Sequence, residues 1–169
     1  KVYKLKKIFI QVLHIAISMT SISILTSTFN REYYLSDLYE SLKKQTFKNF
    51  TWIIGNDGST DNSDNLIKSF INEKKIKIIY AKSNLRVGKS TMDNFLYKLI
   101  KTDFFCYCGS DDYFDKNAFE TMDILLKNIP ENKKSSFHGI ITQSINDNNE
   151  SQTFYNDKIP KTNMFMTWE

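Results

Sequence analysis

The stretch Phe50-Thr51-Trp52-Ile53-Ile54-Gly55-Asn56-Asp57-Gly58-Ser59-Thr60-Asp61-Asn62-Ser63 passes from an apolar run to a polar loop and then to a helix start. Residues 50–54 predict a buried strand, because aromatic and β-branched side chains predominate there. Beyond the loop, Leu66, Ile67 and Phe70 recur at helical spacing and predict a helix over 63–72. A strand joined to a helix by a short polar loop is the repeating unit of a parallel α/β sheet.

The same alternation of strand and helix continues on both sides of this stretch. Parallel strands joined by crossover helices place the loops that follow the strands at one edge of the sheet. We therefore expect three polar loops, at 27–31, 56–61 and 109–112, to lie together. The predicted strands are 21–25, 50–54, 76–80, 104–108 and 138–143, and the predicted helices are 33–44, 63–72, 89–100 and 118–126.

Composition is that of a folded protein with one core. The chain has 169 residues, of which 41% are hydrophobic and 14% aromatic, and this length favours a single domain. The net charge of +4 is spread along the chain without a basic and aromatic stripe, which argues against nucleic acid as a partner. Cys106 and Cys108 alternate along a predicted strand and are expected to be reduced core residues, while His14 and His138 lack the spacing of zinc ligands.

The first twenty residues differ in character from the rest. Four lysines, at positions 1, 4, 6 and 7, precede an apolar segment over 8–19 that is too short to span a bilayer. No small-residue cleavage site of a signal peptide follows it. A packed or peripheral helix is favoured, an amphipathic surface helix or a sequence foreign to the domain remains open, and peripheral membrane contact is therefore a further expectation.

Two adjacent carboxylates, Asp111 and Asp112, follow the apolar run 104–108. A divalent cation in proteins is often held by one or two carboxylates together with substrate phosphates, and the end of a buried strand is where such ligands collect. A turn that caps the helix beginning near Asn117 would use the same residue types. The residues alone leave both interpretations open.

Four segments, in order and spacing across about 21–126, resemble the inverting glycosyltransferases of family 2. Residues 22–31 are similar to the family's opening strand and its Pro-Thr-Tyr-Asn turn, and 41–50 are similar to its Ser-x-x-x-Gln-Thr-Tyr-x-Asn-Phe run. Residues 56–63 resemble the Asp-Asp-Gly-Ser-Thr-Asp-x-Ser signature, and 109–112 resemble the Asp-x-Asp-Asp metal motif. The resemblance implies the GT-A fold, a Rossmann-like, mostly parallel sheet with crossover helices on both faces.

The resemblance also implies a site for a nucleotide-diphosphate sugar and a divalent cation, Mg²⁺ or Mn²⁺. The cation ligands would be Asp111 and Asp112. A carboxylate at Asp57 would accept a hydrogen bond from a base N–H, although Asp57 could instead begin an Asx turn. Arg86 and Lys89 would neutralise the diphosphate, with a solvated surface role as the alternative. The implied donor-binding residues are Thr28, Asn30, Asp57, Arg86, Lys89 and Asp111.

By the same resemblance the chain would transfer a sugar, with inversion, to a glycan or lipid-linked acceptor, in the cytoplasm or at the inner face of the membrane. Residues 1–20 would be an N-terminal extension, 21–145 the nucleotide-sugar-binding domain and 146–169 a C-terminal extension. One alternative is a non-catalytic or truncated nucleotide-sugar-binding module. A nucleotidyltransferase is disfavoured, because the loop 26–31 contains no Gly.

The chain departs from the family pattern in the predicted site. Ser27, Asn56 and Gly109 stand where the family has Pro, Asp and Asp, and the usual Gly-Val-Ser-x-Ala-Arg-Asn loop is altered over 86–92. The resemblance implies that an acceptor-side segment bearing the general base follows the metal motif, and no such segment is recognised in this sequence. Three acids, Glu150, Asp157 and Glu169, qualify as the base by charge alone. The acceptor side of the fold is therefore expected to be truncated.

Overall fold

The computed structural model describes residues 20–130, 132–133, 137–141 and 164–167. The predicted N-terminal helix and the three acids considered as general bases lie outside these residues. In the described part, four strands form one parallel sheet in the order β3-β2-β1-β4. The strands are β1 (Ile22–Thr28), β2 (Phe50–Asp57), β3 (Ile78–Ser83) and β4 (Phe104–Tyr107).

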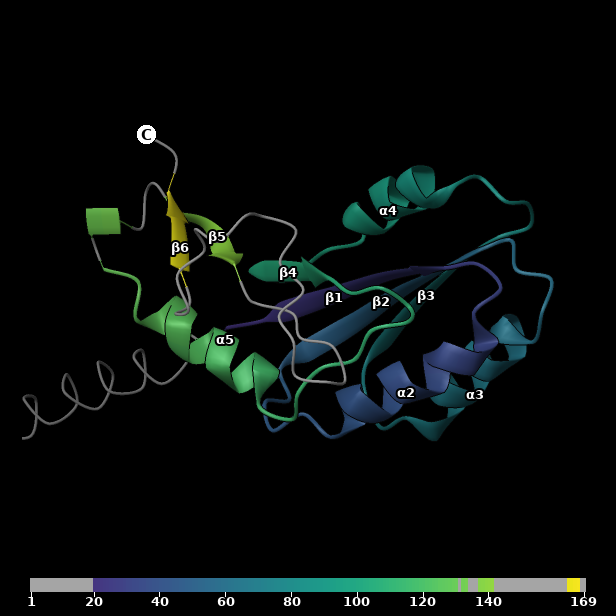
Figure 1. The fold of residues 1–169 in the computed structure, drawn as a ribbon, viewed down its shortest axis with the longest axis horizontal. Coiled ribbons are helices and arrows are strands. Elements are labelled where there is room, and N and C mark those ends of the chain that lie inside the picture. Colours follow the sequence, from purple (N-terminus) through teal and green to yellow (C-terminus); the bar gives the residue numbers. More distant parts are fainter. Residues whose placement is uncertain (1–19, 131, 134–136, 142–163, 168–169) are drawn as a thin grey trace, which may run out of the picture. The chain divides into compact units, whose positions relative to one another are not determined.

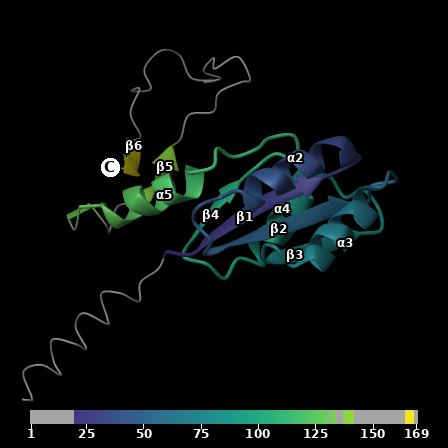
Figure 2. The same cartoon turned by 90° about the horizontal axis from the view of Figure 1, so that it is seen from below.

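Helices cover both faces of this sheet, as predicted. Helices α2 (Glu32–Lys43) and α3 (Ser63–Glu73) lie on one face, and α4 (Lys89–Tyr97) lies on the other (Figure 1). Seen from below, α2 and α3 stand in front of the strands (Figure 2). Helix α5 (Ala118–Lys127) follows β4. The predicted order of helices and strands is thus confirmed over this part of the chain.

Two apolar clusters hold the layers together. On the face of α4, the cluster joins Leu25 and Ile53 to Met92 and Leu96. On the opposite face, the ring of Tyr39 from α2 stacks on Phe70 of α3 with centroids 4.0 Å apart. Burying apolar side chains on both faces is the main stabilising contribution in such a sheet.

The strands reach further toward the polar loops than their apolar runs indicate. Strand β1 continues to Thr28 and β2 to Asp57, because the parallel pairing extends through Ser27↔Gly55 and Thr28↔Asn56. The prediction ended both strands where the apolar residues end, which was wrong by three residues in each case. Strand β3 likewise begins and ends later than predicted.

The chain divides into two compact units, Lys1–Asp123 and Ile124–Glu169. In the second unit, β5 (Phe137–Ile141) and β6 (Met164–Thr167) form an antiparallel pair. Strand β5 overlaps the predicted strand 138–143, whereas β6 was not predicted, because its segment shows no strong hydrophobic period. The predicted domain boundaries stay predictions. Among the described residues, no helix is long and apolar enough to cross a membrane.

Candidate functional site

Four loops follow the carboxyl ends of the parallel strands and meet at one edge of the sheet. We name them in chain order: the first loop (29–31) follows β1, the second (58–62) follows β2, the third (84–88) follows β3 and the fourth (108–117) follows β4. Ligands of open α/β sheets bind at this edge. Direct contacts join the loops in pairs, so their positions are coupled.

Asn30 joins the first loop to the second. Its backbone has φ 51°, a left-handed conformation that Asn tolerates better than most residues. The side-chain oxygen of Asn30 accepts a hydrogen bond from the backbone N–H of Thr60 at 2.8 Å, and its own N–H donates to Ser59 Oγ at 3.0 Å. The structure therefore uses Asn30 between two loops, and its expected contact with a donor stays a prediction.

Asp57 joins the second loop to the third. Its carboxylate is buried and accepts the backbone N–H of Val87 on Oδ1 at 2.7 Å and that of Gly88 on Oδ2 at 3.0 Å. Gly58, with φ 71°, lies against the third loop so closely that a Cβ there would stand 2.5 Å from the carbonyl carbon of Leu85. Asp57 thus shapes the third loop, and its expected contact with a base stays a prediction.

Asn56 stands where the family has an acid. It is fully buried, and both the oxygen and the nitrogen of its side-chain amide form hydrogen bonds. Its oxygen accepts the N–H of Ser59 at 2.8 Å, and its Nδ2 donates to the hydroxyl of Tyr80 at 3.2 Å. The Tyr80 hydroxyl in turn donates to Asp64 Oδ1 at 2.7 Å. Tyr80 has one proton to give, so its other neighbour must be a donor. An amide satisfies this requirement and a carboxylate does not.

The charge of Asp64 is stabilised within the same network. Hydrogen bonds from Lys82, then from Tyr80 and Lys68, hold the pKa of the Asp64 carboxyl well below its usual range. On the second loop, burial opposes ionisation of Asp61, but hydrogen bonds from Ser63 and Glu32 outweigh it and lower the pKa of Asp61. Both acids are therefore structural anions around the loops.

Three further predicted donor-binding residues take different positions. The guanidinium of Arg86 stacks over the ring of Phe29, 4.2 Å from its centroid, and so joins the third loop to the first. Lys89 forms an ion pair with Asp93, one turn along α4, at 2.6 Å. The hydroxyl of Thr28 is buried and has no hydrogen-bond partner among the described residues. Arg86 thus lies within the cluster of loops, whereas the ammonium of Lys89 is engaged on its own helix.

The fourth loop carries the two adjacent acids. Asp111 Oδ2 lies 2.6 Å from Nη1 of Arg31, and Asp112 Oδ2 accepts the N–H of Gly109 at 3.2 Å. A Cβ on Gly109 would stand 2.6 Å from Asp112 Oδ2 and 2.9 Å from Asp111 Oδ1. The two carboxylates therefore converge on the space that a side chain at position 109 would fill.

This convergence fits a divalent cation that takes its other ligands from a substrate. Oxygen ligands suit Mg²⁺ and Mn²⁺, and two carboxylates with phosphates form a common set. Within the described ranges, no group of three or more His, Cys, Asp or Glu side chains could hold a metal ion without such help.

The thiol of Cys108 lies close to these two acids. Burial raises the pKa of Cys108, and the charges of Asp112, Cys106 and Asp111 raise it further.

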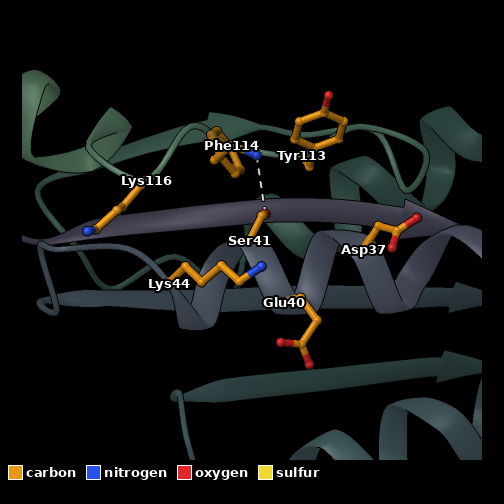
Figure 3. Close-up of a pocket in the computed structure, with 7 residues that line it drawn as sticks. All are labelled: Asp37, Glu40, Ser41, Lys44, Tyr113, Phe114 and Lys116. Atoms are coloured by element: carbon orange, nitrogen blue, oxygen red, sulfur yellow. Dashed lines mark hydrogen bonds between the residues drawn. The ribbon is translucent and has the colours of Figure 1, made fainter. Parts of the chain in front are cut away.

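Two buried polar residues, Ser41 on α2 and Gln45 just after its C-terminal end, support the fourth loop and the first turn of α5. Ser41 Oγ accepts the N–H of Phe114 at 3.2 Å (Figure 3). Gln45 Nε2 donates to the carbonyl of Asp115 at 2.7 Å, and Gln45 Oε1 accepts the N–H of Phe119. Neither residue was given a role from the sequence, although a buried polar pair beside an apolar helix stripe is the signal that could have indicated one.

A cavity of about 300 Å³ opens beside this contact, and the sequence did not predict it. Its lining combines acidic side chains of α2 with the lysines Lys44, just after α2, and Lys116, on the fourth loop (Figure 3). The lining residues are Asp37, Glu40, Ser41, Lys44, Tyr113, Phe114 and Lys116.

Comparison with known proteins identifies a family and relatives whose sequences are similar to this chain. The family model described as Glycosyl transferase family 2 matches residues 23–167. The teichoic acid poly(glycerol phosphate) polymerase of Staphylococcus epidermidis is 30% identical over 94 residues, which are 56% of this chain and 13% of that protein. Glycosyltransferase GlyG of Streptococcus pneumoniae is 28% identical over 102 residues, which are 60% of this chain and 33% of the relative.

A solved structure shares the fold of much of this chain. S. aureus TarS 1–349, crystallised with UDP-GlcNAc, superposes with a TM-score of 0.61 at 20% identity. The superposition covers 75% of this chain and 40% of the TarS chain. The chain thus spans less than half the length of each of these three proteins. With 145 consecutive residues matched by the family model, the chain belongs to glycosyl transferase family 2.

Proposed function

We propose that this chain transfers a sugar, with inversion and with the help of a divalent cation, from a nucleotide-diphosphate sugar to a glycan or lipid-linked acceptor. The observation that carries the proposal is the pair of converging carboxylates, Asp111 and Asp112, at the edge where all four loops meet. Membership of the family supports sugar transfer as the reaction.

Different residues of this chain have different roles in the proposed donor binding. Asp57 holds the third loop in place, and Arg86 presents a cation at the junction of the first and third loops. Asp111 and Asp112 would hold the cation, which supplies Lewis-acid stabilisation of the leaving diphosphate. The mannosyltransferase PcManGT of Pyrobaculum calidifontis shares the fold with a TM-score of 0.63 at 11% identity. Its solved structure is a complex with GDP-Man and Mn²⁺, which supports a cation here.

The names of two relatives support a cell-surface polymer as the class of acceptor. The S. epidermidis protein is a polymerase of a teichoic acid, and S. aureus TarS is a poly(ribitol-phosphate) N-acetylglucosaminyltransferase. We therefore place the acceptor of this chain among cell-surface glycan polymers or their lipid-linked precursors.

Isothermal titration with UDP, GDP and dTDP sugars, each with and without Mn²⁺, tests the proposal. We expect binding of one nucleotide series and a gain in affinity with Mn²⁺. Asp111→Asn should reduce the Mn²⁺-dependent gain by about tenfold or more, because it removes one anionic ligand. The matched control is Asp37→Asn, an exposed acid on α2, which should behave as the unaltered chain. Folded protein that binds none of the donors would overturn the proposal.

The second candidate function is a nucleotide-sugar-binding module that does not transfer. Gly109 favours it, because this residue removes a carboxylate that the family carries beside Asp111. Transfer and donor hydrolysis, measured on this chain with each nucleotide sugar that it binds, separate the two functions. Binding without turnover would favour the module.

A further inference from the structure

Arg31 is a cation in the candidate site that the family resemblance did not indicate. It is the last residue of the first loop and immediately precedes α2. Its Nη1 lies 2.6 Å from Oδ2 of Asp111, eighty positions along the chain, and its Cζ lies 5.6 Å from the ring centroid of Tyr34. This ion pair joins the first loop to the fourth.

The ion pair lies where a divalent cation would bind. Asp111 turns Oδ1 toward Gly109, where Oδ2 of Asp112 also lies, and Oδ2 toward Arg31. Two adjacent carboxylates repel each other unless a positive charge is near, and the guanidinium supplies that charge. A metal ion that takes Asp111 as a ligand would therefore compete with Arg31 for the same carboxylate.

The ion pair between Arg31 and Asp111 is weak enough for a divalent cation to displace Arg31. The side chains of Arg31 and Asp111 are 44% and 49% exposed, and an ion pair this exposed shifts an equilibrium by no more than about fivefold. Such a contact can be displaced by a divalent cation. Once released, a planar guanidinium is well suited to bind a diphosphate through two parallel hydrogen bonds.

We propose that Arg31 holds Asp111 in the donor-free protein and leaves it for the donor's diphosphate when the metal ion binds. Each anion then keeps a positive partner throughout, since the metal ion replaces Arg31 at Asp111 while Arg31 moves to the phosphates. Because binding linkage is reciprocal, donor and metal ion each raise the affinity for the other. The exchange with the donor rests on the proposed function, whereas the competition between Arg31 and the metal ion does not.

Titration of the full chain with Mn²⁺ alone tests the competition, with electron paramagnetic resonance of the free aqueous ion as the readout. We expect Arg31→Gln to bind Mn²⁺ about twofold to fivefold more tightly than the unaltered chain. Arg31→Lys keeps the charge and should show a smaller gain. Lys44→Gln removes the same charge at the opposite end of α2, about 20 Å along the helix from Arg31 at about 1.5 Å per residue, and should leave Mn²⁺ affinity unchanged. Circular dichroism verifies that each variant is folded.

A second titration, with UDP and GDP in the presence and absence of Mn²⁺, tests the exchange. In Arg31→Gln, the factor by which Mn²⁺ improves nucleotide affinity should fall, whereas Lys44→Gln should keep it. Mn²⁺ affinity in Arg31→Gln no greater than in Lys44→Gln would overturn the inference even if nucleotides bind. Tighter Mn²⁺ binding in a protein that binds no nucleotide would instead support the competition and contradict the proposed function.

Discussion

Replacing Asp57 with Asn tests whether its carboxylate organises the third loop. The change preserves size but replaces one oxygen by an NH₂ group, which cannot accept the backbone N–H of either Val87 or Gly88. One backbone donor of the third loop then loses its partner. In Asp57→Ala both donors lose theirs.

The expected loss of stability follows from these two hydrogen bonds. Asp57 is only 3% exposed, so its carboxylate is largely shielded from water. A buried hydrogen bond to a charged group contributes about 1.5–3 kcal/mol, so Asp57→Asn should lower the free energy of unfolding by about 2 kcal/mol and Asp57→Ala by about twice that. For a urea m-value of about 2 kcal/mol per M, the Asn variant should unfold about 1 M earlier.

Urea unfolding followed by far-ultraviolet circular dichroism measures these losses. Asp37→Asn is the matched control, because it removes one negative charge from an exposed position and should leave the midpoint within error. An Asp57→Asn midpoint equal to that of this control would refute the reasoning, because the carboxylate would then not hold the third loop.

Three further predictions concern acid stability, thiol reactivity and backbone strain. Hydrogen bonds, first from Lys82, lower the pKa of Asp64 in the folded chain. The stabilising contribution of the Asp64 carboxylate is therefore present above its unfolded pKa of about 4 and is lost as the pH falls through the folded value. Urea midpoints of Asp64→Asn should thus vary less than those of the unaltered chain between about pH 5 and pH 2. Burial raises the pKa of Cys106 to about 12, so in a Cys108→Ser variant Ellman's reagent at about pH 8 should react slowly with the native protein and rapidly in urea. Gly58→Ala adds a collision with the third loop to the strain of a positive φ and should cost about 2–4 kcal/mol by urea unfolding; a fully stable variant would contradict the contact.

The order of strands and helices could be predicted because hydrophobic periods report which face of an element is buried. Leu66, Ile67 and Phe70 mark α3 in this way, and Ile53 and Ile54 mark β2. The ends of β1 and β2 could not be predicted by that rule. Asn56 and Asp57 are polar residues in a strand, and they are buried there because their side chains hydrogen-bond to neighbouring elements.

The candidate site was predictable in its location and less so in its contacts. The edge of the sheet follows from parallel topology, and the acids of the fourth loop lie there as expected. The pairing of Arg31 with Asp111 depends on two loops that are distant in sequence, and no local pattern reports it. The same holds for Gln45, whose amide contacts a segment seventy residues away.

The hydrogen-bonded chain from Asn56 through Tyr80 to Asp64 also constrains how this sequence can evolve. An acid at position 56, as in the family pattern, would leave two carboxylates in competition for the single proton of the Tyr80 hydroxyl. The effect of that one substitution therefore depends on positions 64 and 80, a case of epistasis between neighbours in space. Introducing the acid of the family pattern without this competition would first require a change at one of those two positions, so the order of mutations matters.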